Sequence, residues 1–287
     1  MLTRILNAFL FSSVFIMLCA LAMVAQTADL FQLHQLNPFY FLFTAGGTVT
    51  SYNLHWYFTD TKINHAQSVR YEWTHQHQYL LLPLAVFGGI LSVISFYFLD
   101  QYRIALLTGI LLAALYTAPK VPGKLSMLLR KIAIAKTIYL ALAWTYVTTI
   151  LPLIITNQPF NLHTIAFIIH RYFFIYALCI LFDYRDRKED IKQGIRSLIT
   201  ILSDNGITIL FYLSVTIGIV MAVLFAGNAN ALLKGILLCI PLLIATLFFK
   251  KAKQSKNDYL YYFIIDGLMF LSFLLTSFQQ WSSFLWP

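Results

Sequence analysis

The amino-acid sequence predicts an all-α membrane protein, a single bundle of about nine transmembrane helices. Of its 287 residues, 60% are hydrophobic and only 11% are charged, whereas soluble domains carry roughly 25% charged residues. Apolar stretches close to the length that crosses a bilayer, about 20 residues, recur along the whole chain. The basic residues gather in every second connection between these stretches. With so little charge to face water, most of the surface is expected to face lipid.

The apolar stretches define the expected helices in chain order. They are residues 5–25, 38–58, 78–99, 102–118, 132–155, 162–182, 205–226, 231–249 and 259–278. The first stretch resembles a secretory signal because Arg4 precedes it and small residues occur near Ala25. It is longer than the roughly 7–15 apolar residues of such signals, so we expect an uncleaved helix. Residues 1–287 are expected to form one transmembrane domain.

The positions of the basic residues predict the orientation. If the N-terminus is cytoplasmic, all of the 20 Lys and Arg residues except Arg103, Arg171 and Lys234 lie on the cytoplasmic side. Such a bias is typical of cytoplasmic loops. The net charge of +9 is therefore attributed to these loops and not to binding of nucleic acid. We expect an integral multi-pass protein of a bacterial inner membrane, in contact with membrane lipid.

The most concentrated group of acidic residues follows the sixth stretch. Asp183, Asp186 and Asp190 are spaced i, i+3 and i+7, and on a helix these positions share one face. Carboxylates on one face repel each other unless a positive group lies among them. A hard divalent cation such as Mg²⁺ binds well to one or two carboxylates together with phosphate oxygens. The three aspartates are therefore a candidate metal site.

Basic residues follow this group directly. Lys192 and Arg196 have side chains that bind phosphate oxygens, arginine through its planar fork and lysine as a point charge. Gly194 would let the backbone approach a ligand closely. Taken alone, the run is equally consistent with a solvated loop that obeys the positive-inside rule.

The run D-Y-R-D-R-K-E-D-I-K-Q-G-I-R-S-L resembles the second aspartate-rich motif of the UbiA superfamily of intramembrane prenyltransferases. That motif is D-x-x-D-x-x-x-D followed by a glycine-containing loop and a Thr/Ser-Leu pair, at the end of the sixth span. The resemblance implies a UbiA-like fold of about nine helices. It also implies Mg²⁺ at Asp183, Asp186 and Asp190, and diphosphate held by Lys192 and Arg196.

The superfamily's first motif, N-x-x-x-D-x-x-x-D, is only partly matched. Asn53 matches its asparagine and is implied to bind diphosphate, whereas Tyr57 and Thr61 occupy the two aspartate positions. Asp60 is one position out of register, about 100° around a helix. The resemblance leaves His55 and Asp60 as candidates to replace part of the first metal cluster. A plain helix-end role for Asp60 stays open.

A third basic stretch follows the fourth span. Its sequence, Y-T-A-P-K-V-P-G-K at residues 116–124, is similar to a Tyr-x-x-Pro…Lys stretch of the same superfamily. The resemblance implies that Lys124 helps to bind diphosphate. A proline-ended helix with positive-inside lysines explains the stretch equally well.

Other polar residues give weaker indications. His75 and His77 are two residues apart and do not share a helix face, so no metal site is predicted there. Arg171 lies within the sixth span. A charge inside a membrane is a functional candidate by default, although a position near the outer interface would let it reach water.

The resemblance implies transfer of an isoprenyl group from a prenyl diphosphate to a lipophilic acceptor, of aromatic or quinone type. The alternative is a non-catalytic protein of the same fold that binds an isoprenoid or lipid. The degenerate first motif leaves both open, and the sequence predicts neither the acceptor, the chain length nor the oligomeric state.

Overall fold

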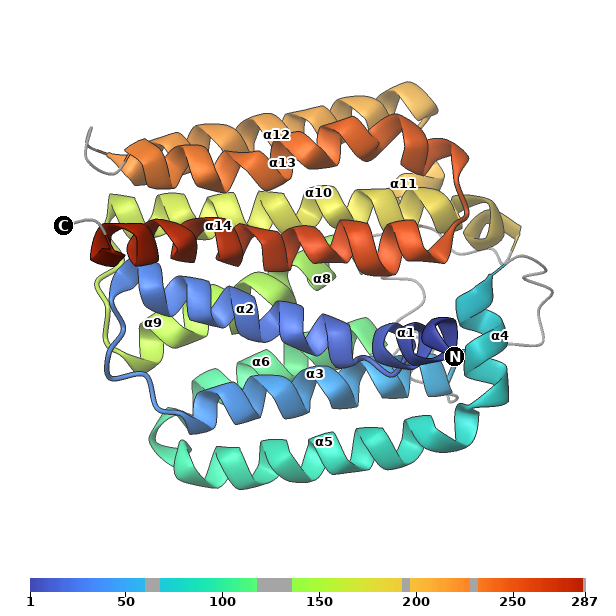
Figure 1. Cartoon of the computed structure of the whole chain (residues 1–287), viewed down its shortest axis with the longest axis horizontal. Coiled ribbons are helices and arrows are strands. Elements are labelled where there is room, and N and C mark those ends of the chain that lie inside the picture. Colours follow the sequence, from blue (N-terminus) through green and yellow to red (C-terminus); the bar gives the residue numbers. More distant parts are fainter. Residues whose placement is uncertain (60–67, 118–135, 193–196, 228–231, 286–287) are drawn as a thin grey trace.

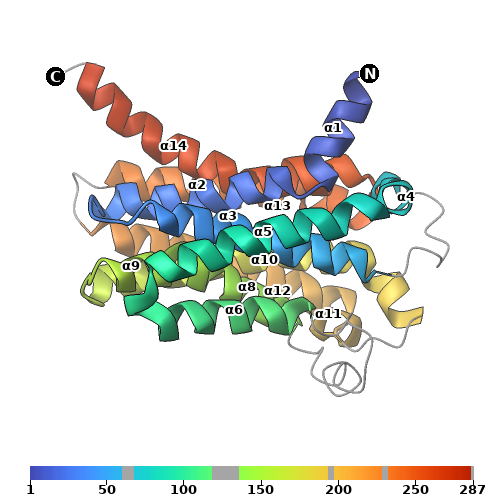
Figure 2. The ribbon, with the colours of Figure 1, turned by 90° about the horizontal axis from the view of Figure 1, so that it is seen from below.

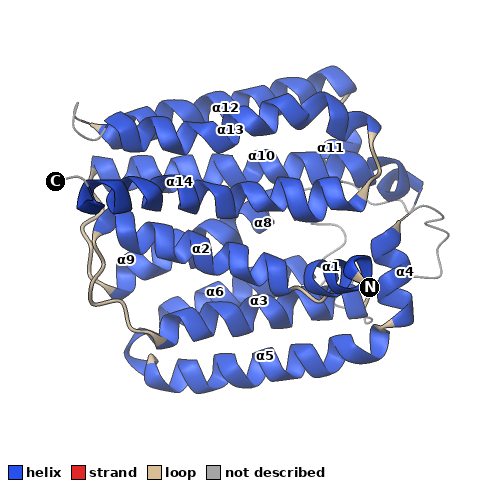
Figure 3. Ribbon diagram, in the orientation of Figure 1, coloured by secondary structure: helices blue, strands red, loops and turns tan. Residues whose placement is uncertain are grey.

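The computed structural model describes residues 1–59, 68–117, 136–192, 197–227 and 232–285. All regular structure in these ranges is helical (Figure 3). The helices are α1 (Leu2–Phe11), α2 (Val14–Phe31), α3 (Phe39–Tyr57), α4 (Val69–Gln76), α5 (Gln78–Phe98), α6 (Arg103–Thr117), α8 (Lys136–Thr145), α9 (Leu151–Ile155), α10 (Leu162–Lys192), α11 (Leu198–Ile201), α12 (Asp204–Ala226), α13 (Leu232–Gln254) and α14 (Asp266–Leu285). A 3₁₀ turn at Asp100–Tyr102 and π-helical segments at Tyr146–Ile150 and Leu260–Ile265 complete the fold.

The long helices run side by side and form one bundle (Figure 1). Helices α12 and α13 lie along one edge and α5 along the other, with α10 and α14 between them. The N-terminus, α4, α11 and the end of α10 lie at the same end of the bundle, as expected if they share one side of the membrane. Helix α1 and the last part of α14 project away from the body in Figure 2.

Within the described ranges, seven helical segments are long and apolar enough to span a membrane, which confirms an all-α multi-pass membrane protein. They are Val14–Phe31, Gln78–Phe98, Lys136–Ile155, Leu162–Lys188, Asp204–Ala226, Leu232–Gln254 and Leu260–Ser277. The two remaining predicted segments are also helical, as α3 and α6. Helix α6 has only 15 residues, and α3 carries polar residues such as Asn53 and His55. The predicted number of nine spans therefore stays a prediction.

The π-helical segment before α9 has a clear cause in the sequence. Pro152 lacks a backbone N–H, so the carbonyl of Thr148 has no intrahelical α-type donor. The hydroxyl of Thr27 on α2 donates to that carbonyl over 2.7 Å. The hydroxyl of Tyr40 on α3 donates to the neighbouring carbonyl of Val147. The irregular turn thus fixes α2 and α3 against the fifth span.

Helices α3 and α5 approach each other at a pair of glycines. A Cβ added to Gly46 would lie 2.4 Å from the carbonyl oxygen of Gly88, and one added to Gly88 would lie 2.6 Å from that of Gly46. Both residues must therefore be glycine at this contact. The hydroxyl of Thr50 adds a hydrogen bond of 3.0 Å to the Ala85 carbonyl.

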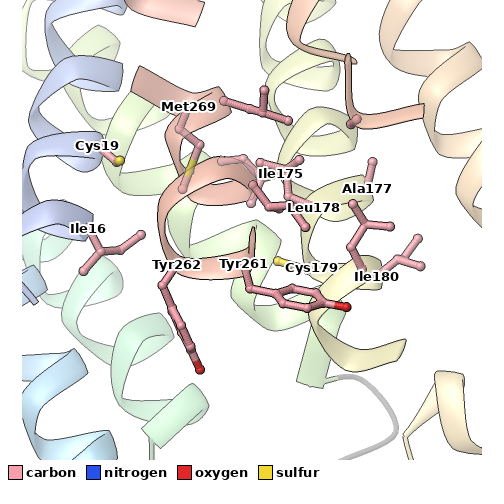
Figure 4. Packing of buried hydrophobic residues seen from close by; sticks show 14 of the residues in the cluster. Ile16, Cys19, Ile175, Ala177, Leu178, Cys179, Ile180, Tyr261, Tyr262 and Met269 are labelled. Atoms are coloured by element: carbon pink, nitrogen blue, oxygen red, sulfur yellow. The ribbon is translucent and has the colours of Figure 1, made fainter. Parts of the chain in front are cut away.

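The largest apolar core lies where α1, α2, α10 and α14 meet. Figure 4 shows Ile16 and Cys19 of α2 on one side of Met269 of α14, and Leu178 and Cys179 of α10 on the other side. Tyr261 and Tyr262, from the π-helical segment before α14, continue this core. The Tyr262 hydroxyl accepts a hydrogen bond from Arg185 near the end of α10, whereas the Tyr261 hydroxyl donates to the Ala252 carbonyl on α13.

Candidate functional site at the end of α10

Helix α10 does not end where the membrane-crossing stretch was predicted to end, at residue 182. It continues to Lys192, so Asp183, Asp186 and Asp190 are helical and share one face. Asp183 and Asp190 are buried, with 7% and 9% exposure. We call this region of the bundle the aspartate end.

Asp183 is held by the start of α8. The hydroxyl of Thr137 donates a hydrogen bond to its carboxylate, and the Lys136 Nζ lies 3.6 Å from Asp183 Oδ1. A basic residue predicted only to mark the cytoplasmic side is thus a counter-ion of the first aspartate. The contact joins the fifth span to the sixth at the site.

Asp186 is held by the residue before it. Arg185 donates to both carboxylate oxygens, from Nε over 2.8 Å and from Nη2 over 3.2 Å. The same Nη2 also donates to the Tyr262 hydroxyl over 3.0 Å. The guanidinium is stacked 4.6 Å from the centre of the Tyr261 ring. The pairing of Arg185 with both carboxylate oxygens of Asp186 is the bidentate geometry that arginine favours.

A fourth carboxylate, Asp258, lies within the cluster and was not predicted. It is 4% exposed and lies between α13 and the last span. Its Oδ2 accepts hydrogen bonds from the Ser68 hydroxyl over 2.9 Å and from the Arg70 backbone N–H over 3.0 Å. Its Oδ1 lies 3.6 Å from Arg185 Nη1. The one available signal was its position as the first acidic residue after a run of four lysines at residues 250–256.

Arg70 on α4 is a second buried cation at the aspartate end. Its guanidinium lies 4.1 Å from the Trp56 ring centre and 4.3 Å from that of Tyr262, and the residue is 3% exposed. Burial lowers the pKa of this guanidinium from its ordinary value. Burial also raises the pKa of the neighbouring Tyr71, and the negative charge of Asp186 adds to that shift. Helix α4 therefore reaches the aspartate end through the contact of Arg70 with Asp258.

The first-motif residues are partly described. Asn53 is fully buried, and its amide nitrogen donates to the carbonyls of Ser12 and Val49 over 3.2 and 2.8 Å. His55 is 7% exposed, and its ring lies 6.2 Å from that of Trp56. The amide nitrogen of Asn53 is thus already bonded to backbone. Asp60 lies outside the described residues.

The basic residues expected to bind diphosphate fall mostly outside the described part of the chain. Lys124 and Arg196 lie outside it, as does Gly194. Lys192 is described and exposed at the last position of α10. The structure therefore places Lys192 beside Asp190 on one helix and does not place the other two.

The donor atoms at the aspartate end have the right chemistry for Mg²⁺, since carboxylate oxygens are its preferred protein ligands. Among the described residues, however, no three His, Cys, Asp or Glu side chains are grouped so that they could hold one ion. Lys136 and Arg185 instead neutralise Asp183 and Asp186. A cation would fit the donor type and would have to compete with these internal counter-ions.

Two predicted polar positions lie away from this cluster. Arg171 is 1% exposed and stacks 4.9 Å from the Phe167 ring centre, so it does not reach water. Its neighbour His170 contacts the Gly218 carbonyl oxygen through Nδ1 over 2.9 Å. His77 stacks on Trp73, with ring centres 4.7 Å apart.

Comparison with known proteins identifies the family. Residues 76–274 match the model of the UbiA prenyltransferase family. The matched range includes α10 with its aspartates, Arg185 and Asp258, and begins after α3. Searches of curated proteins and of solved structures gave no match.

Proposed function

The chain belongs to the UbiA prenyltransferase family, and we propose that it transfers an isoprenyl group from a prenyl diphosphate to a lipophilic acceptor at the aspartate end. The observation that carries the proposal is the set of Asp183, Asp186 and Asp190 on the last turns of α10. This set lies where the apolar bundle meets a cluster of buried cations and aromatic rings. A substrate with a charged head and an apolar chain fits such a boundary.

The head group is the part that these residues would bind. We propose Asp183, Asp186 and Asp190 as ligands for Mg²⁺, with one or two carboxylates on an ion and phosphate oxygens completing its coordination. We propose Lys124, Lys192 and Arg196 as contacts of the diphosphate, and Asn53 as a further contact once its amide nitrogen exchanges a backbone carbonyl for a phosphate oxygen. Bound Mg²⁺ supplies the charge neutralisation that makes diphosphate a leaving group. The protein's own part is to hold the head group in place and to keep water away.

The aromatic side chains at this end give the proposal a second line of support. The faces of Trp56 and Tyr262 already hold one cation, the guanidinium of Arg70. An allylic cation left after departure of diphosphate interacts with such faces in the same way, by about 0.5–2 kcal/mol for each ring. We propose no single aromatic residue as catalytic.

The experiment is Mg²⁺-dependent binding of radiolabelled farnesyl diphosphate to purified protein in detergent. We expect binding by the wild type with Mg²⁺, none with EDTA, and none by the Asp183→Ala/Asp186→Ala double variant. Asp100→Ala is the matched control, because Asp100 pairs with Arg103 on the connection between α5 and α6, away from the site. Equal binding by the double variant, or binding in EDTA, would overturn the site assignment.

A non-catalytic protein that binds an isoprenoid is the second candidate. It is favoured by one observation, that Tyr57 and Thr61 occupy the first-motif positions where the family resemblance expects aspartates. Incubation of the labelled diphosphate with a membrane lipid extract separates the two. Label in a new lipid supports the transferase, whereas binding without transfer to any component supports the binder.

A further inference from the structure

The guanidinium of Arg185 lies between two carboxylates. It is bonded through Nε and Nη2 to Asp186, and its Nη1 faces Asp258 Oδ1 over 3.6 Å. The arginine side chain is 9% exposed and the Asp258 side chain is 4% exposed, whereas that of Asp186 is 42% exposed. The Arg185 guanidinium therefore neutralises two carboxylates, the buried one of Asp258 and the accessible one of Asp186.

The two contacts are unequal. Those with Asp186 are hydrogen bonds, whereas Nη1 makes no hydrogen bond in the described structure, and 3.6 Å is longer than the usual range for such a bond. A movement of less than about 1 Å would bring Nη1 within bonding distance of Asp258. Arg185 Nη1, which makes no hydrogen bond in the described structure, thus lies opposite the Asp258 carboxylate oxygen that could accept one.

We infer that Arg185 is an internal competitor for Asp186, and that Asp258 is the alternative acceptor that takes the guanidinium when a divalent cation binds Asp186. This inference rests on the proposed function, because it assumes that Asp186 is a cation ligand. A guanidinium that is shielded from water and has no charged partner destabilises the protein. Asp258 removes that cost by keeping the arginine paired after it leaves Asp186.

The exchange also connects the aspartates to α4. The other oxygen of Asp258 binds the Ser68 hydroxyl and the Arg70 backbone N–H, and Ser68 caps the start of α4 by accepting from the Tyr71 N–H. A stronger bond from Arg185 to Asp258 therefore acts on the residue that anchors this helix. Asp258 is a positioning residue, because it acts on Asp186 only through Arg185.

The test measures the affinity of the purified protein for Mn²⁺ by electron paramagnetic resonance, with Mg²⁺ as competitor. We expect Arg185→Gln to bind Mn²⁺ about tenfold more tightly, because it removes the competitor. We expect Asp258→Asn to bind it about tenfold more weakly, because the arginine loses its alternative acceptor. In the Arg185→Gln background, Asp258→Asn should then have no further effect.

Arg187→Gln is the matched control, because Arg187 carries the same charge two positions away and pairs with Asp204. If it tightens Mn²⁺ binding as much as Arg185→Gln does, the effect is general electrostatics and the inference is overturned. Arg185→Lys, which keeps the charge without the fork, serves if the glutamine variant does not fold. It should also tighten binding, by a smaller factor.

The outcomes separate the inference from the proposed function. Wild-type binding that Asp183→Ala/Asp186→Ala abolishes, together with unchanged affinity in both the Arg185 and the Asp258 variants, overturns the inference and leaves the proposed function standing. Additive effects of the two substitutions also overturn it. A wild type that binds no Mn²⁺ overturns both.

Discussion

Two arginines of helix α10 lie in opposite surroundings, Arg171 fully buried and Arg185 with its side chain 9% exposed. Arg185 lies among carboxylates and the Tyr262 hydroxyl, whereas Arg171 has the Phe167 ring as its cation–π contact, and neither of its terminal nitrogens makes a hydrogen bond in the described structure. The two residues are about 21 Å apart along the helix axis. The same residue type on one helix is thus part of a charge network in one case and an isolated charge in the other.

The difference shows that burial of a charge does not by itself identify the site. Both arginines have little contact with solvent, and the sequence drew attention only to Arg171, because it interrupts an apolar stretch. The cluster at the aspartate end is distinguished by its partners, which come from α4, α8 and the connection before α14. Substitutions that remove either charge should therefore have opposite effects on stability.

The largest effect is expected for Arg185→Met. The change removes the ion-pair partner of the buried Asp258 carboxylate and the two hydrogen bonds from Arg185 to Asp186, at a cost on the order of 3 kcal/mol. The free energy of unfolding, measured by titration with SDS in mixed micelles, should fall by about that amount. A loss no larger than that of the exposed ion-pair variant Arg103→Met would contradict the network.

The opposite sign is expected for Arg171→Met. Arg171 has no ion-pair partner among the residues that the structure describes. Removing its charge removes a desolvation cost and keeps most of the packing, so the protein should gain about 1–2 kcal/mol. The same SDS titration measures it. A loss of stability would show that Arg171 has a partner, such as a bound lipid, and would remove the contrast between the two arginines.

The helices were the predictable part of the fold. Runs such as 78–99 and 205–226 are apolar because lipid surrounds them, and they correspond closely to α5 and α12. Hydropathy identifies the apolar part of a helix and not its full length. It therefore ended the sixth stretch at residue 182, although α10 continues to Lys192. It also gave no sign of the short helices α4 and α11.

The site was predictable only where its residues are close in sequence. Asp183, Asp186 and Asp190 lie within one short run, and their spacing predicted a shared face that α10 provides. Asp258 is about 70 residues away in sequence and has no motif around it. Its role depends on Ser68, Arg70 and Arg185 meeting in space, which no local pattern encodes.

A smaller effect is expected for Tyr262→Phe. This change removes the hydroxyl that accepts from Arg185 Nη2 and keeps the ring against Arg70. The loss of one hydrogen bond to a charged group should cost about 1–2 kcal/mol in the SDS titration. Tyr212→Phe, in a half-exposed tyrosine on α12, is the control and should cost less. Equal losses would mean that the hydroxyl adds nothing to the Arg185 network.

The smallest effect is expected for Lys136→Met. Its ammonium lies 3.6 Å from Asp183 and its side chain is 26% exposed, so solvent screens the pair and the loss should be about 0.5 kcal/mol. Asp183 keeps the hydrogen bond from Thr137, which limits the cost further. Combined with Arg185→Met, the change should add nearly its own small value, because the two cations serve different carboxylates. Strong non-additivity would instead show that Lys136 and Arg185 act as one counter-ion for the aspartate face.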